Sequence, residues 1–301
     1  MVEQSNDQQQ VALMPQPKRR RASLPILILA VLFVSATCLT WYYTWFGRDL
    51  SDQEITRYLS DEKHPRHVQH ALLQIEQRME QSGSNCCQQW YAKIQELTSN
   101  PEPEFRMTAA WLMGYDNKSE QFHQTLLSLL NDKEPMVQRN ASLALVRFND
   151  SSGRENLLTI LKPFPVVAPF DGVVNSTLNE GSSVSRGTLL ARILGTNGAV
   201  VEVRSPLPGK IVKIENGNGS QCRAGATILT LSSDATSVWE ALRGLALIGK
   251  PDDLGEIKRY AQGVGTLPED VKKQAALTMK SIQGRSVQQG ENGQRPQKSS
   301  L

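Results

Sequence analysis

Residues 166–174 read VVAPFDGVV, and residues 203–212 read VRSPLPGKIV. Each stretch has a small residue and a proline ahead of a glycine, and aliphatic residues follow the glycine. This order is typical of a strand, a tight turn that requires glycine, and a second strand. The two stretches therefore predict a β domain that contains two copies of one unit.

The likeness of the two copies extends over residues 164–232, where three pairs of turn residues recur. The pairs are Pro169 with Pro206, Gly172 with Gly209, and Gly187 with Gly225. The first two pairs are 37 residues apart and the third is 38 residues apart, so a single inserted residue aligns the copies. We assign these residues to the structural motif of the β domain.

Two such copies in tandem resemble the barrel-sandwich hybrid shared by biotinyl and lipoyl carrier domains and by membrane-fusion, or periplasmic adaptor, proteins. In the carrier families the modified lysine sits in the hairpin that joins the two halves. Here the join is Gly195–Gly198, and the lysines of the domain, Lys210 and Lys213, lie in the second copy. The sequence therefore predicts no cofactor. Adaptor proteins insert a long helical hairpin at the join, for which four turn residues leave no room.

Amphipathic helices are predicted on the N-terminal side of the β domain, over residues 50–163. Residues 121–130 (QFHQTLLSLL) and 137–148 (VQRNASLALVRF) carry apolar side chains at spacings of three and four. The pattern that starts at Phe105-Arg106 recurs at Val137-Gln138, an offset of 32 residues. A helical hairpin buries its apolar face only by stacking on neighbours, so this repeat predicts an α-solenoid. An irregular helical bundle is the alternative.

These helices resemble the HEAT-repeat family, in which the second helix of each unit opens with an acidic residue, a hydrophobic residue and an arginine. Arg106 keeps the basic position, whereas Gln138 replaces it in the next unit. The β domain is predicted to interrupt one unit, because residues 154–161 form a first helix whose partner is due near residue 170. Removing residues 164–232 brings Val238 to position 169, and the HEAT-like repeats then continue over residues 233–283.

Residues 24–46 contain no charged residue, and four consecutive basic residues, 18–21, precede them. Such a segment is long enough to cross a membrane, and the basic residues place the N-terminus in the cytoplasm. The sequence predicts a bacterial inner-membrane protein with a cytoplasmic tail (1–23), a transmembrane helix and periplasmic domains. A cleaved signal peptide, with Val34-Ser35-Ala36 as its cleavage site, is the alternative. Residues 284–301, rich in Gln, Gly and Ser, are expected to be disordered.

Motifs for catalysis and metal binding are not found in the sequence. It lacks a nucleophile elbow, a phosphate-binding glycine loop and a metalloprotease helix motif, so we expect no enzyme. His64, His67 and His70 are three residues apart, and the last two share a face of the predicted helix. No acidic residue or cysteine at matching spacing completes a ligand set, so no metal site is predicted.

The predicted fold is a multidomain α plus β protein: a single transmembrane helix, a HEAT-like α-solenoid and an inserted β barrel-sandwich hybrid. Its 33 basic and 30 acidic residues leave a net charge of +3, which argues against nucleic acid as a partner. We expect a membrane-anchored, non-enzymatic scaffold or protein-binding module whose partners are the membrane and other envelope proteins. The alternative is a periplasmic adaptor of a transport or secretion system.

Overall fold

The computed structural model describes residues 24–41, 48–196, 198–264 and 267–293. The chain divides into two units, Met1–Asp49 and Leu50–Leu301. In the first unit the described element is α1 (Leu24–Trp41), which has 18 residues and no charged side chain. The predicted cytoplasmic tail, residues 1–23, lies outside the described residues.

The helices of the described residues test the predicted membrane anchor. Among the described residues, no helix combines the length and the apolar character that a membrane crossing requires. The prediction of a transmembrane helix over 24–46 is therefore wrong, and so is the inner-membrane localisation with periplasmic domains that rested on it. Residues 42–46 of that prediction lie outside the described residues.

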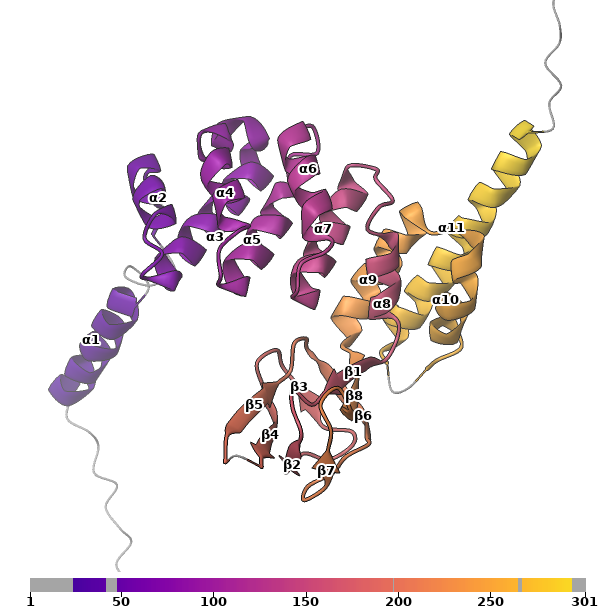
Figure 1. The fold of residues 1–301 in the computed structure, drawn as a ribbon. Helices are drawn as coiled ribbons and strands as arrows, with labels where there is room; N and C mark the ends of the chain where they lie inside the picture. The colour runs from indigo at the N-terminus through magenta and orange to yellow at the C-terminus, as the bar shows by residue number, and fades with distance from the viewer. Residues whose placement is uncertain (1–23, 42–47, 197, 265–266, 294–301) are drawn as a thin grey trace, which may run out of the picture. The chain divides into compact units, whose positions relative to one another are not determined.

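The helices of the second unit form consecutive hairpins (Figure 1). Three of the second helices open with a proline. Proline is tolerated at this position because the first N–H groups of a helix have no hydrogen-bond partner within the helix. The hairpins are α2 (Asp52–Leu59) with α3 (Pro65–Ser82), α4 (Tyr91–Leu97) with α5 (Pro103–Met113), α6 (Glu120–Leu129) with α7 (Pro135–Arg147), α8 (Arg154–Ile160) with α9 (Ala235–Ile248), and α10 (Leu254–Ala261) with α11 (Glu269–Gly293). Short 3-10 helices, η2 (Ser84–Trp90) and η3 (Pro251–Asp253), lie between hairpins.

Two hydrophobic clusters form the core of these hairpins. The first runs through α2 to α7 and includes the fully buried Phe105 and Phe122. The second joins α8 to α9, because Leu157 packs in the same cluster as Val238 and Leu245. Leu143 of α7 packs against this second cluster, so the helical packing continues from α7 into α9.

The β domain lies in sequence between α8 and α9 and has two four-stranded antiparallel sheets. Its strands are β1 (Phe164–Val167), β2 (Gly172–Asn175), β3 (Ser183–Val184), β4 (Leu189–Gly195), β5 (Val200–Arg204), β6 (Gly209–Ile214), β7 (Gln221–Cys222) and β8 (Thr227–Ser233). The sheet orders are β1-β8-β6-β3 and β5-β4-β2-β7. Exchanging β1–β4 with β5–β8 converts one order into the other, so the two sequence copies occupy equivalent positions.

These sheets do not close into a barrel, which corrects the predicted barrel-sandwich hybrid. Each sheet ends in strands that pair with one neighbour only, and no described ladder joins the two sheets. The edge strands β3 and β7 have two residues each, too few to extend a ladder from one sheet to the other. The fold is a mixed α and β structure in which two open sheets pack face to face over small apolar clusters.

The C-terminal helix also departs from expectation. α11 runs from Glu269 to Gly293, whereas the sequence predicts a disordered tail from residue 284. The remainder of that tail, residues 294–301, lies outside the described residues. The packed segment of α11 that contains Val271 and Ala275 nucleates this helix, and glutamine and serine are tolerated on a helix that is already nucleated.

Candidate functional site

Aromatic and arginine side chains gather on the second helices α5, α7 and α9 and in the turn that follows α5. We call this set the aromatic–arginine surface; it comprises Trp111, Tyr115, Arg147, Trp239, Arg243 and Leu247. Its position follows from the fold, because α5 packs on α7 and α7 on α9. Side chains on equivalent faces of successive second helices thereby become neighbours, although more than a hundred residues separate Trp111 from Trp239 in sequence.

Glu76 of α3 orients two aromatic side chains, which form one half of this surface. Its Oε1 accepts hydrogen bonds from Trp111 Nε1 at 2.8 Å and from the Tyr115 hydroxyl at 2.9 Å. The Arg147 guanidinium lies over both rings, 4.9 Å from the Trp111 centroid and 4.6 Å from that of Tyr115. Burial and the hydrogen bond to Glu76 raise the pKa of Tyr115, so its hydroxyl remains a donor. The rings are therefore fixed in orientation before any partner arrives.

The other half lies on α9, where the Arg243 guanidinium is 4.8 Å from the Trp239 centroid. A cavity of about 200 Å³ lies between the two halves, lined by Trp111, Leu143, Val146, Arg147, Glu240, Arg243, Gly244 and Leu247. Leu247 at its margin is 65% exposed. Gly244 brings α9 close to α8, since a Cβ there would lie 2.7 Å from Leu157 Cδ1.

The rim of this cavity is positively charged, because Arg147 and Arg243 line it. Its one acidic lining residue, Glu240, forms an ion pair with Arg139. Within the described part of the chain, neither Arg147 nor Arg243 has a carboxylate at ion-pair distance. Tryptophan, tyrosine and arginine beside an apolar cavity are the residue types that dominate binding energy at protein interfaces. The cation–π interaction with the ring also stabilises the charged guanidinium, which then needs no ion-pair partner in the same chain.

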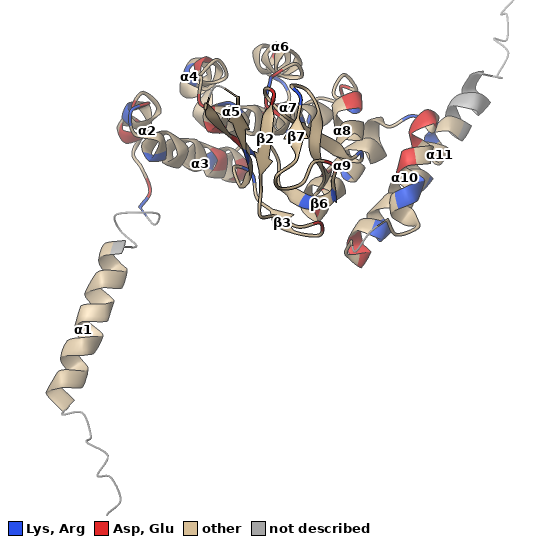
Figure 2. Ribbon diagram, turned by 60° about the horizontal axis from the view of Figure 1, so that its bottom comes forward, with Lys and Arg blue, Asp and Glu red and all other residues tan. Residues whose placement is uncertain are grey.

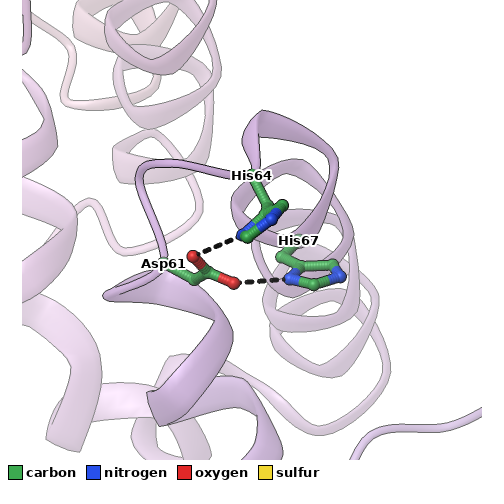
Figure 3. A group of neighbouring side chains, drawn as sticks. All are labelled: Asp61, His64 and His67. Carbon is green, nitrogen blue, oxygen red and sulfur yellow. Dashed lines mark hydrogen bonds and ion pairs between the residues drawn. The ribbon is translucent and has the colours of Figure 1, made fainter.

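A second group of polar side chains lies in the turn between α2 and α3 and in the first turn of α3 (Figure 3). His64 Nδ1 is 2.8 Å from Asp61 Oδ1, and His67 Nδ1 is 2.7 Å from Asp61 Oδ2. The hydrogen bonds from these two imidazoles hold the pKa of Asp61 below its ordinary value. The His67 ring stacks on Tyr58, with centroids 4.3 Å apart.

Sequence reasoning had singled out His64, His67 and His70 but missed Asp61. The structure places His67 and His70 on one side of α3, where both rings lie near Tyr58. Asp61 precedes the helix, so a search at helical spacing does not find it. An acidic residue within a turn that leads into a histidine-containing helix was the available signal.

The residues predicted as the structural motif lie at equivalent positions of the two copies: Gly172 and Gly209 open β2 and β6, and Gly187 and Gly225 lie in turns. Gly187 and Gly225 have φ angles of 80° and 76°, which favour glycine. The join at 195–198 is the turn between β4 and β5, although Asn197 lies outside the described residues. Lys210 and Lys213 both lie in β6, away from that turn. The described residues of the turn therefore offer no lysine for a lipoyl or biotinyl group.

Charged residues of both signs alternate over the helices (Figure 2). Blue basic and red acidic positions are interspersed along α2, α3 and α10 in this view. Such a distribution differs from the single-sign face that phosphate backbones select.

Comparison with known proteins supports part of this description. Residues 92–167 match the family of HEAT repeats, which confirms the HEAT-repeat resemblance for the segment from α4 to β1. A search for similar curated proteins found none. A solved structure, described as a single-chain, multi-domain long-chain acyl-CoA carboxylase, is 15% identical with a TM-score of 0.23. The similarity covers 44% of this chain and 11% of that chain. A TM-score of this size supports no conclusion about fold or activity.

Proposed function

We propose that this chain is a non-enzymatic scaffold that binds a protein partner on the aromatic–arginine surface. The observation that carries the proposal is the pair of arginines, Arg147 and Arg243, each stacked on an aromatic ring beside one cavity. Repeat proteins commonly bind partners along the surface that successive repeats build together. Fixed aromatic rings lose little conformational freedom on binding, which favours affinity.

The chemistry of the surface indicates what the partner presents. A cavity of about 200 Å³ with an exposed leucine at its margin accommodates an aliphatic or aromatic side chain. The two arginines at the rim pair with carboxylates on either side of that anchor. The proposed partner is therefore a protein segment in which an apolar anchor is flanked by acidic residues.

The β domain has a supporting role in this proposal. We assign it to docking rather than to carrying a group, because the described residues of the β4–β5 turn include no lysine. Its contact with the repeats includes an ion pair from Arg186 to Glu104 at the start of α5. An adaptor role would require a helical hairpin between β4 and β5, where the chain has room for residues 196–199 only.

To test this proposal, a photo-crosslinking amino acid is introduced at Leu247 of the full chain. The cells that naturally produce the protein are then irradiated. We expect a defined crosslinked protein whose yield falls about 10- to 100-fold when Arg147 and Arg243 are changed to glutamate. The matched control carries the crosslinker at Gln124, an exposed position on the first helix α6.

A second control reverses the charge of Arg259, an exposed arginine on α10 that forms an ion pair within its own helix. This substitution should leave the crosslink from Leu247 unchanged. Equal crosslinking from Gln124 and Leu247, or equal loss with Arg259→Glu, would refute binding at the aromatic–arginine surface.

A further inference from the structure

The arrangement of Asp61, His64 and His67 differs from an ordinary helix cap. His64 is the residue before α3, yet its side chain makes no capping hydrogen bond to the helix. Instead both imidazoles turn toward one carboxylate, and each places its Nδ1 on a different carboxylate oxygen (Figure 3). The ligating atoms of the three side chains all lie within 4.8 Å of one another.

The separation of the two imidazole rings can be compared with the separation that a shared metal ion requires. Their centroids are 5.2 Å apart. With a metal–nitrogen distance of about 2.05 Å, a ring radius of about 1.15 Å and a tetrahedral angle of about 109°, two imidazoles on one ion have centroids about 5.2 Å apart. The rings therefore already have the spacing of a tetrahedral pair of ligands.

Other contacts hold these side chains in place without a metal. The His67 ring stacks on Tyr58 at an interplanar angle of 12°, which fixes the direction in which Nδ1 points. His64 and His67 are three residues apart at the start of α3, so the helix fixes their relative position. A site whose ligands are oriented in advance binds its ion without having to order them first.

We propose that Asp61, His64 and His67 bind one Zn²⁺ ion through two imidazole Nδ1 atoms and one carboxylate oxygen. This site is independent of the aromatic–arginine surface. Two nitrogens and one oxygen suit a borderline ion such as Zn²⁺, whereas Mg²⁺ and Ca²⁺ favour oxygen ligands. Water completes the tetrahedron, since the His64 side chain is 66% exposed.

Binding requires small movements of these side chains, because their ligating atoms lie within 4.8 Å of one another and ligands on one tetrahedral ion lie about 3.3 Å apart. The nitrogen-to-oxygen distances are now 2.8 and 2.7 Å, and they become about 3.3 Å when both atoms ligate one tetrahedral ion. The Asp61 carboxylate therefore withdraws by roughly half an ångström, while the proton of each neutral imidazole moves from Nδ1 to Nε2 through solvent, so that the Nδ1 lone pair faces the ion. Asp61 lies in an exposed turn after α2, so its side chain can move without disturbing buried residues.

The test is calorimetric titration of the full chain, free of any histidine tag, with ZnCl₂. We expect one equivalent of Zn²⁺ to bind, and His64→Gln or His67→Gln to weaken binding at least about tenfold. The matched control is His123→Gln, because His123 also bonds a carboxylate, that of Asp150 at 2.7 Å, and stacks on Phe148. This control should retain wild-type affinity.

Substitution with Co²⁺ identifies the ligands directly. The N,N,O site predicts visible absorption of a tetrahedral ion without the intense near-ultraviolet band of a thiolate ligand. A thiolate band would assign the metal to Cys86 or Cys87 and overturn the proposal. Failure to bind Zn²⁺, or equal affinity in His64→Gln and wild type with unchanged circular dichroism, would overturn it too.

Discussion

Gly172 and Gly209 show how single residues fix the β domain. Each opens the second strand of its copy and lies against a neighbouring strand, where a side chain would collide with backbone. A Cβ at Gly172 would lie 2.5 Å from the Leu194 carbonyl oxygen, and one at Gly209 would lie 2.1 Å from that of Ser232. The glycines that recur 37 residues apart in sequence are therefore required by the same close approach of strands in each sheet.

Gly209→Ala tests this requirement. Because the added methyl group meets a carbonyl oxygen that belongs to the backbone, β6 and β8 must separate, and we expect a loss of about 1–3 kcal/mol in the free energy of unfolding. The matched control is Gly217→Ala, where the nearest atom to an added Cβ is 3.9 Å away. Urea unfolding followed by fluorescence and circular dichroism measures both, and equal stability of the two variants would contradict the explanation.

At the scale of elements, Arg106 and Asp132 connect consecutive hairpins. The Arg106 guanidinium donates to Asp132 from Nε at 2.8 Å and from Nη2 at 2.9 Å; the side chains of Arg106 and Asp132 are 6% and 9% exposed. Nη1 also donates to the carbonyls of Asn100 and Pro101 at the turn before α5. Asp132 in turn accepts from the N–H of Glu134 at the start of α7. The arginine of the HEAT pattern thus ties the turns of two neighbouring repeats together.

Asp132→Asn is expected to destabilise the protein by about 3 kcal/mol at neutral pH, because it leaves the buried charge of Arg106 uncompensated. Burial opposes ionisation of Asp132, but hydrogen bonds from Arg106 outweigh it and lower the pKa. A lowered pKa in the folded state means that the stabilisation is complete above the unfolded pKa of about 4 and disappears as the pH falls through the folded value.

The difference in stability between wild type and Asp132→Asn should therefore be constant from pH 5 to 7 and shrink at lower pH, as measured by urea titrations. Glu256→Gln removes an exposed pair on α10 and serves as the control, with a change below about 1 kcal/mol. A difference that persists undiminished in strong acid would show that Asp132 acts through its shape and not its charge.

Elements were predictable where their signal was local. The periodic apolar residues of α6 and α7 and the glycine turns of the β domain predict their elements, because spacing along the chain determines which side chains are buried. The aromatic–arginine surface was missed, since Trp111 and Arg243 become neighbours only when α5, α7 and α9 pack. Apolar composition over 24–46 predicted a membrane helix, but among the described residues no helix is long and apolar enough to cross a membrane.

On the scale of the whole molecule, the β domain enters and leaves the helical repeats at nearly one point. Its first and last strands pair with each other, with Phe164 opposite Leu231. Paired residues on antiparallel strands are about 5 Å apart, so α8 and α9 meet almost as if a short loop joined them. Tyr260 of α10 strengthens this junction, since its hydroxyl donates to the Leu161 carbonyl at 2.7 Å. An insertion with adjacent ends costs its host little closure entropy.

Deletion of residues 164–232 behind a short Gly-Ser linker should therefore leave the helical repeats folded. We expect an unchanged helical signal per molecule in circular dichroism, and a single cooperative unfolding transition at a modestly lower temperature, because the ion pair between Arg186 and Glu104 and the packing of Met136 on the β domain are lost.

Leu157→Ala sharpens the test, because Leu157 is fully buried in the cluster that joins α8 to α9. If these two helices form one hairpin, the substitution lowers the free energy of unfolding by about 2–5 kcal/mol, and by the same amount in the full chain and in the deletion variant. A cost that vanishes on deletion, or a host that no longer unfolds cooperatively, would mean that α8 and α9 depend on the β domain for their packing. The equal cost is the expected result, since the buried cluster that contains Leu157 is built from the helical repeats and includes no residue of a described strand.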